Sequence, residues 1–417
     1  MSDRQLQIPV ICLLLLAVNI LIERSVFNRA YTLALLADRV EVQRDNVVDN
    51  QTNHPVETNG TLEDFDTAIW PPMKQVLCVK GAPNLQLSSL LFQLARSEVF
   101  EKGVEESYRS GQQKFLPTRN ETDVVTPSPV VKRFFYGGGG ATYLKGRNEN
   151  GRKFRTMYLR IWKCANNQIE HMIDRLYIGM NGTSIIHGEI WPLFKLARKL
   201  KRRTKAPLCI HTAIRDPISH FLSGYNEAEY RIATDWKNDQ DQPIEPAPYH
   251  FRVPHSKSSP VLRRKRFQAL VEDLLLEEPN LKGVYQHFFP MSRVLSALAD
   301  YGLSLTGYNP TVENITSTWP QFMSSTCPGF LARDTIENMF RTGPPVELQN
   351  GGHKSSLDKH GFYEAAKEVW REGGPIARAL CLLHAFDYAC FEDLPEGIPE
   401  LCRTVYREYS EEIVGLG

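Results

Sequence analysis

The middle of the chain alternates short apolar runs with segments of helical periodicity. Three apolar runs predict strands, at Thr156–Trp162, Ser184–Ile190 and Leu208–Ile214. Two segments, Asn167–Ile178 and Ile218–Tyr230, have the spacing of amphipathic helices. Strands that alternate with helices predict an α/β fold with a parallel sheet flanked by helices, and with ligands at the carboxyl ends of the strands.

A different pattern precedes this region. Ile8–Ile22 is an uncharged apolar run of 15 residues, which as a helix spans roughly 22 Å, less than a hydrocarbon core of about 30 Å. Charged residues follow it, and they favour a short membrane anchor over a cleaved signal peptide or a buried helix. Residues 45–72 are polar and contain proline, as in a stem or linker.

These changes in pattern divide the chain into six parts. We expect a tail (1–7), the anchor or signal (8–22), a stem (23–72), an accessory segment (73–150), the main α/β domain (151–396) and a second tail (397–417).

Sequons and cysteines bear on the compartment. N-x-S/T sequons occur at Asn50, Asn59, Asn120, Asn181 and Asn314. Five sequons suggest a luminal body, although unmodified surface asparagines remain the alternative. The chain has 8 cysteines without a CxxC pair, and seven follow Cys12, so some could pair in an oxidising lumen and at least one stays free. Cys390 and Cys402 flank a turn-rich stretch and are the first choice for a bridge.

Charge and composition argue against several classes of protein. Lys+Arg minus Asp+Glu is 49 − 48 = +1, which argues against a surface that grips nucleic acid as a whole. The hydrophobic fraction of 42% excludes a mostly disordered chain. Two windows, 195–205 and 246–271, are basic and contain no acid. Each is either a solvated face or a site for an anionic polysaccharide.

A glycine-rich segment, 134–154, suggests a nucleotide loop at first sight. The Walker pattern needs Gly-Lys-Ser/Thr and a following helix, and Gly140 is followed by Ala-Thr-Tyr instead. We therefore interpret this segment as a flexible hairpin.

Two strand–loop–helix units are better candidates for an anion site. In the first, the strand runs into Lys163, Cys164, Ala165, Asn166, Asn167 and Gln168, and then into a helix. A helix N-terminus presents backbone N–H groups to an anion, and Lys163 adds an ammonium.

The second unit is centred on Arg215-Asp216-Pro217. Arg215 ends a strand, Pro217 suits the first turn of a helix, and Ser223 lies two turns along it. A guanidinium suits phosphate bidentately and a hydroxyl adds a hydrogen bond. Alternatively, Asp216 caps the helix and pairs with Arg215.

The two units together resemble the PAPS-dependent sulfotransferases, and most closely the Golgi branch that acts on carbohydrates. In that family the first loop holds the 5′-phosphosulfate, while the Arg and Ser of the second unit hold the 3′-phosphate. The family usually has Ser or Thr in the first loop, where this chain has amides. Further matches follow in order over about 155–391: His287 with Pro290, Gly307 with Glu313, and Asp387-Tyr388 with Phe391. The 351–361 segment resembles the family's loop that closes over the nucleotide, with an exposed polar turn as the alternative.

The resemblance implies the sulfotransferase fold over 151–396, PAPS as co-substrate, no metal, and a Golgi membrane protein with a luminal catalytic domain. Lys163 would stabilise the leaving phosphate. His187, after a short strand and before Gly188, is our candidate for the general base, with Glu189 next and a structural histidine as the alternative. The acceptor would be a carbohydrate hydroxyl. A small-molecule, lipid or tyrosine acceptor, or an inactive glycan-binding module, stays open, as does the oligomeric state.

Overall fold

The computed structural model describes residues 65–100, 127–180, 182–203, 207–233, 247–255, 259–277, 283–312, 314–327, 329–342 and 360–415. The apolar run 8–22, four of the five sequons, Glu313 and most of the 351–361 loop lie outside them. Residues Thr61–Gly417 form one compact unit. That unit includes helices from the expected accessory segment and from the second tail.

The centre of this unit is a five-stranded sheet. Its strands are β3 (Gly140–Arg147), β4 (Lys153–Leu159), β5 (Ser184–Glu189), β6 (Cys209–Ala213) and β7 (Gly307–Asn309), in the order β5-β3-β4-β6-β7. β4, β6 and β7 are parallel, whereas β3 runs antiparallel to both β4 and β5. The fold is α/β as predicted, but the expectation of a parallel sheet was wrong, because the sheet is mixed.

The antiparallel strand comes from the glycine-rich segment. β3 and β4 form a hairpin around a turn, in which the side chain of Asn148 accepts hydrogen bonds from the N–H groups of Asn150 and Arg152. The prediction that this segment forms a hairpin was therefore correct. Gly139, just before β3, lets its backbone lie close to the backbone of Arg160, just after β4. A Cβ on Gly139 would lie 2.8 Å from the carbonyl oxygen of Arg160.

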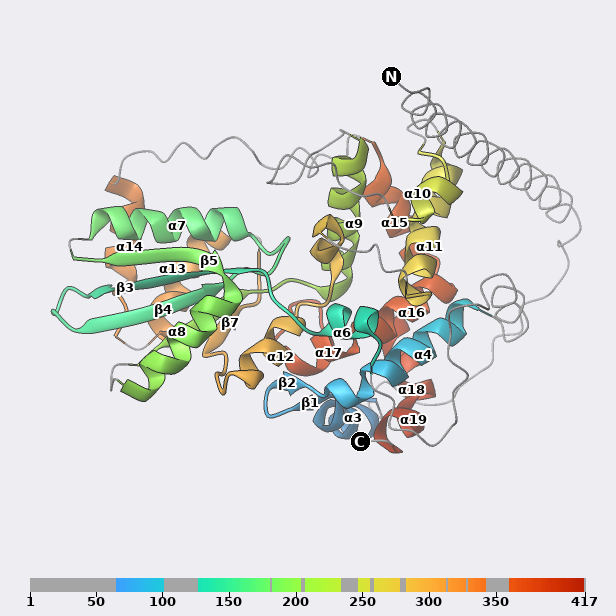
Figure 1. Ribbon diagram of the computed structural model, residues 1–417, viewed down its shortest axis with the longest axis horizontal. Coiled ribbons are helices and arrows are strands. Elements are labelled where there is room, and N and C mark those ends of the chain that lie inside the picture. The colour runs from blue at the N-terminus through green and yellow to red at the C-terminus, as the bar shows by residue number, and fades with distance from the viewer. Residues whose placement is uncertain are drawn as a thin grey trace, which may run out of the picture. The chain divides into compact units, whose positions relative to one another are not determined.

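Helices cover both faces of the sheet (Figure 1). α7 (Asn166–Gly179) and α13 (Ile315–Thr326) lie on one face and α8 (Ile190–Arg203) on the other. One row of side chains across the sheet points towards α7 and α13. It contains His187, Thr142, Tyr158 and His211, which are neighbours in register.

The remaining elements form a largely helical region beside the sheet (Figure 1). They are η2 (Phe65–Ile69), α3 (Trp70–Leu77), β1 (Cys78–Val79), β2 (Ala82–Pro83), η3 (Leu85–Leu87), α4 (Ser88–Val99), α6 (Pro129–Phe135), α9 (Pro217–Ala233), α10 (Tyr249–Arg252), α11 (Pro260–Leu275), η4 (Gly283–Phe288), α12 (Arg293–Asp300), α15 (Phe362–Arg371), α16 (Pro375–Leu383), α17 (Ala385–Cys390), α18 (Glu400–Glu408) and α19 (Ser410–Gly415). The exception is α14 (Arg333–Thr342), which packs against α7 and α13 on the face of the sheet. α16 packs against α4 and α18, so segments from both ends of the unit share one core.

Three disulfides cross-link this unit. They join Cys78 to Cys390, Cys209 to Cys327 and Cys381 to Cys402, while Cys164 is buried and unbridged. The predicted Cys390–Cys402 bridge was wrong. Packing of α16 against α18 brings Cys402 to Cys381, and the short strand β1 brings Cys78 to Cys390.

Candidate functional site

The loop between β4 and α7 has an unusual backbone. Lys163 has φ +64° and Ala165 has φ +57°, both in the left-handed region that L residues rarely adopt. Ala165 precedes α7, and no side chain caps that helix. Because an uncapped helix N-terminus leaves its first N–H groups pointing outwards, the loop is a concave donor surface suited to an anion.

The side chains of this loop point in different directions. Asn167 and Gln168 are exposed, whereas Asn166 is buried and its amide oxygen accepts from the Tyr158 hydroxyl at 2.6 Å. Cys164 is fully buried, and burial raises the pKa of its thiol to about 12. Of the three amide side chains expected to bind an anion, the two exposed ones face solvent and Asn166 anchors the loop to the sheet.

Lys163 makes an ion pair inside the protein. Its Nζ lies 3.1 Å from Oε2 of Glu227 on α9, whose carboxylate also pairs with Arg231. Burial lowers the pKa of Lys163, and the charge of Glu227 acts in the opposite direction. The ammonium is thus held on the α9 side of the loop.

The second unit meets the first at Arg215. The Arg215 guanidinium donates to the carbonyl oxygen of Lys163 at 3.5 Å. Asp216 Oδ1 accepts from the N–H of Ser219 at 2.6 Å, so Asp216 caps α9 as the alternative interpretation held, with Pro217 in the first turn. The ion pair with Arg215 that belonged to the same interpretation is not found among the described residues. Ser223 is partly exposed and makes no hydrogen bond within the described part of the chain.

Two other segments that were matched by sequence converge on these units. Asp387 is buried and accepts from the N–H groups of Met291 and Ser292, directly after Pro290. Burial acts to raise the pKa of Asp387, but hydrogen bonds from His384 and Ser292 make the net shift downward. The neighbouring Tyr388 donates to Asp216 at 3.5 Å.

The residue after Ser223, Gly224, lies where α9 passes close to the backbone of η4. A Cβ at this position would lie 2.4 Å from the carbonyl oxygen of His287. α9 therefore crosses the backbone of η4 at a distance that only glycine permits, and this contact fixes Ser223 relative to the His287 segment.

His187 lies within β5 and not next to the 163–168 loop. Its ring is 3.0 Å from Thr142 Oγ1 and 3.2 Å from Asp174 Oδ1, and the side chain is 46% exposed. Asp174 is eight residues after Asn166, or about 12 Å along α7. Glu189 is exposed and pairs with Gly140, closer to the strand end that carries the loop. Of the two expected bases, Glu189 is therefore nearer to that edge of the sheet.

The sequence did not single out His220, which lies on α9 one turn before Ser223. Its Nε2–H donates to the carbonyl oxygen of Trp162 at 2.8 Å, while its buried Nδ1 has no partner within the described residues. Burial lowers the pKa of His220 to about 3, so the ring is neutral at pH 7. The position of a histidine inside the Arg215–Ser223 segment was the only signal available.

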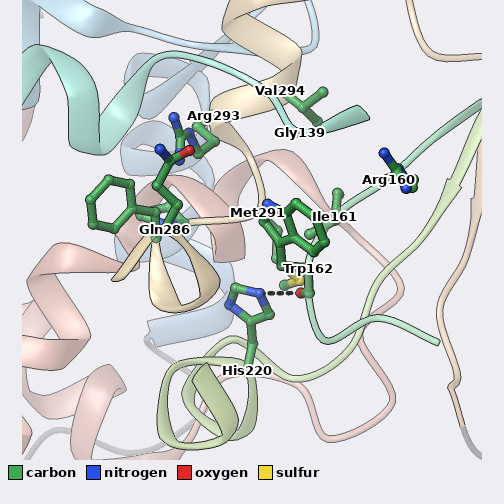
Figure 2. A pocket seen from close by; sticks show the side chains of 12 residues that line it. Gly139, Arg160, Ile161, Trp162, His220, Gln286, Met291, Arg293 and Val294 are labelled. Carbon is green, nitrogen blue, oxygen red and sulfur yellow. Dashed lines mark hydrogen bonds between the residues drawn. The ribbon is translucent and has the colours of Figure 1, made fainter. Parts of the chain in front are cut away.

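A pocket adjoins the loop at Trp162 (Figure 2). It is an open hollow with about 280 Å³ of space, a volume that includes bulk solvent at its mouth. It is lined by Gly138, Gly139, Arg160, Ile161, Trp162, His220, Gln286, Phe289, Pro290, Met291, Arg293 and Val294. Trp162 stacks on His287, with ring centroids 4.8 Å apart and planes 10° apart.

The second basic window, 246–271, is largely paired where it is described. In the 246–271 window Arg266 is buried and lies 2.9 Å from Glu229. Arg264 pairs with Glu372, and Arg252 with Asp273. These contacts favour a structural role for the second window.

No protein-family model matches this chain, and neither does any curated protein or solved structure. Among the described residues, no helix is both long and apolar enough to cross a membrane. The same part of the chain contains no group of three His, Cys, Asp or Glu side chains placed to hold a metal ion.

Proposed function

We propose that this protein is a sulfotransferase that moves the sulfuryl group of PAPS to a hydroxyl of a carbohydrate acceptor. The observation that supports this most is the hydrogen bond from Arg215 to the Lys163 carbonyl. It joins the two strand–loop–helix units that resemble the family's two phosphate sites.

The donor site in this proposal has two ends. The uncapped N-terminus of α7 and the 163–168 loop take the phosphosulfate, because that surface presents N–H groups to a group of high negative charge. Arg215 and Ser223 take the 3′-phosphate, since Ser223 on α9 is partly exposed and Arg215 lies just before the first residue of the same helix.

The reaction is an in-line displacement at sulfur. The acceptor oxygen forms a bond to sulfur as the bond from sulfur to the 5′-phosphate oxygen breaks, and the acceptor proton passes to a base. Lys163 stabilises the charge that develops on the leaving phosphate. Glu227 holds the Lys163 ammonium until the donor anion competes for it.

His187 is our base, oriented by Asp174 and Thr142 as a positioned imidazole requires. Its distance along α7 from the loop leaves Glu189 as the alternative. His220 is a third candidate, because its side chain lines the pocket next to the loop and its buried Nδ1 has no hydrogen-bond partner among the described residues.

The compartment in this proposal is the lumen of the secretory pathway. Three disulfides within one compact unit support an oxidising environment. The Golgi location and the anchor at 8–22 remain proposals.

A transfer assay tests the function. Full-length protein is incubated with radiolabelled PAPS and a panel of polysaccharides. We expect Lys163→Ala to lower kcat by about 10²-fold and Arg215→Ala to weaken PAPS binding about 10- to 100-fold. The matched controls are Lys153→Ala and Arg152→Ala, which change exposed residues of the β3–β4 hairpin and should stay within about twofold of the parent.

The same assay assigns the base. His187→Ala should lower kcat while the affinity for PAPS is unchanged, and His220→Gln and Glu189→Gln are measured beside it. Transfer that survives both the Lys163 and the Arg215 change would refute the donor site.

One observation favours a second function. Glu227 already pairs with Lys163, so this lysine can have a structural role without taking part in transfer. An inactive glycan-binding module on the same fold could retain such an ion pair. Binding of polysaccharide without label transfer to any acceptor would support that alternative.

A further inference from the structure

The pocket beside the loop contains a cation with no acidic partner. Arg293 begins α12 and is mostly buried, and no carboxylate lies within ion-pair distance of it in the described ranges. Its Nε is inaccessible and unpartnered, and one weak hydrogen bond reaches the carbonyl oxygen of Tyr136 at 3.5 Å. Burial, followed by the charge of Arg133, lowers the pKa of Arg293 to about 10.

An uncompensated buried charge is costly, and it is usually paired or bound to a ligand. The guanidinium packs over the ring of Phe289 at 5.0 Å and against Gly137, where a Cβ would collide with it. The fold thus provides space and an aromatic surface for Arg293, but no countercharge.

The other polar groups of the pocket also lack partners. The side chain of Gln286 lines the same pocket (Figure 2) and makes no hydrogen bond within the part of the chain that the structure describes. His220 Nδ1 is likewise unpartnered and acts as an acceptor, because Nε2 donates to Trp162. By contrast, Arg160 already pairs with Glu170 at 3.3 Å.

These groups have the composition of a sugar site. A guanidinium binds a carboxylate or a sulfate, an amide binds hydroxyls, and apolar and aromatic side chains cover C–H faces. The purine of a nucleotide is neutral and would leave Arg293 without a countercharge.

We propose that this pocket binds an acidic sugar unit of the acceptor, with Arg293 holding its carboxylate or sulfate group. The inference rests on the proposed function and narrows its acceptor class to anionic glycans. Trp162 lines the pocket and precedes Lys163, so a chain bound there passes next to the site of transfer.

Binding to full-length protein is measured by calorimetry without PAPS, and transfer is measured separately. The probes are chondroitin, which carries glucuronate, its carboxyl-reduced derivative, and a sulfated galactan without carboxylates. We expect the parent to bind chondroitin at least 10-fold more tightly than its reduced form. The galactan shows whether a sulfate can replace the carboxylate.

Arg293→Gln should weaken chondroitin binding about 10- to 100-fold and raise KM, while kcat and the affinity for PAPS change less than twofold. Gln286→Ala should weaken binding several-fold without removing charge. The matched control is Arg333→Gln, which removes an exposed guanidinium on α14.

The outcomes separate the two proposals. Equal binding of acidic and reduced probes, or unchanged binding by Arg293→Gln, overturns the pocket inference even if transfer from PAPS is observed. If PAPS is neither bound nor used but chondroitin binding still depends on Arg293, the pocket inference holds and the sulfotransferase proposal fails. An Arg293→Gln protein that loses PAPS and chondroitin binding equally would assign Arg293 to the fold or to the donor site.

Discussion

At the scale of single residues, the site combines paired and unpaired charges. Lys163 has its partner in Glu227, whereas Arg293 lacks one within the described residues. A paired buried charge is compatible with folding alone, while an unpaired one beside a pocket points to a ligand. The same reasoning applies to buried histidines, which stay neutral because burial disfavours their charged form.

His211 gives a prediction about pH. It is fully buried among Tyr158, Trp319 and Phe322, and neither ring nitrogen has a hydrogen-bond partner among the residues that the structure describes. Burial lowers its pKa to about 3. The unfolded chain binds a proton near pH 6.5 and the folded protein does not. Stability from this residue is therefore fully present above pH 6.5 and falls as the pH drops towards 3.

Between pH 7 and 5 the free energy of unfolding should fall by about 2 kcal/mol from His211 alone. His211→Phe should remove that share and keep the stability at pH 7 within about 1.5 kcal/mol. Urea unfolding of the parent and the variant at pH 7 and pH 5 measures this change in the free energy of unfolding. An unchanged difference between the two pH values would show that His211 is not the titrating group.

At the scale of elements, the sequence patterns located the strand–loop–helix units well. β4, β6, α7 and α9 all lie within or next to the ranges that periodicity predicted. The cap of α9 by Asp216 could also be predicted, because capping depends on residues within one turn. The direction of β3 could not, since it depends on which strands flank it.

The crossing of α9 and η4 gives a prediction at this scale. Gly224→Ala places a Cβ 2.4 Å from a backbone carbonyl oxygen, so the two elements must separate. We expect a loss of about 1 to 3 kcal/mol in unfolding free energy and weaker PAPS binding, because α9 carries Ser223. Denaturant unfolding and calorimetry measure the two effects.

Gly415→Ala is the control, because a Cβ there meets nothing within 4 Å and alanine favours a helix. It should leave both quantities nearly unchanged. A Gly224→Ala protein of parental stability would contradict the close crossing.

At the scale of the whole molecule, the disulfides connect distant parts of the chain. The Cys78–Cys390 bridge closes a separation of 312 residues, and the Cys381–Cys402 bridge closes 21. Chain entropy then gives upper limits of about 6 and 3 kcal/mol for their stabilisation.

We therefore expect Cys78→Ser with Cys390→Ser to lower the unfolding free energy more than Cys381→Ser with Cys402→Ser. Denaturant unfolding compares the two double variants. Peptide mapping without reductant should recover the three linked pairs, and a linked peptide that joins Cys390 to Cys402 would contradict the pairing.

The sequence by itself determined the local features: the α/β alternation, the two loops that end strands, and the start of α9. Those features depend on residues close together in the chain, whose periodicity and turn chemistry are visible without a fold. Only the tertiary structure decided the mixed sheet, the disulfide pairing, the partner of Lys163 and the lone charge of Arg293. Each of these depends on contacts between segments far apart in sequence, which no local pattern encodes.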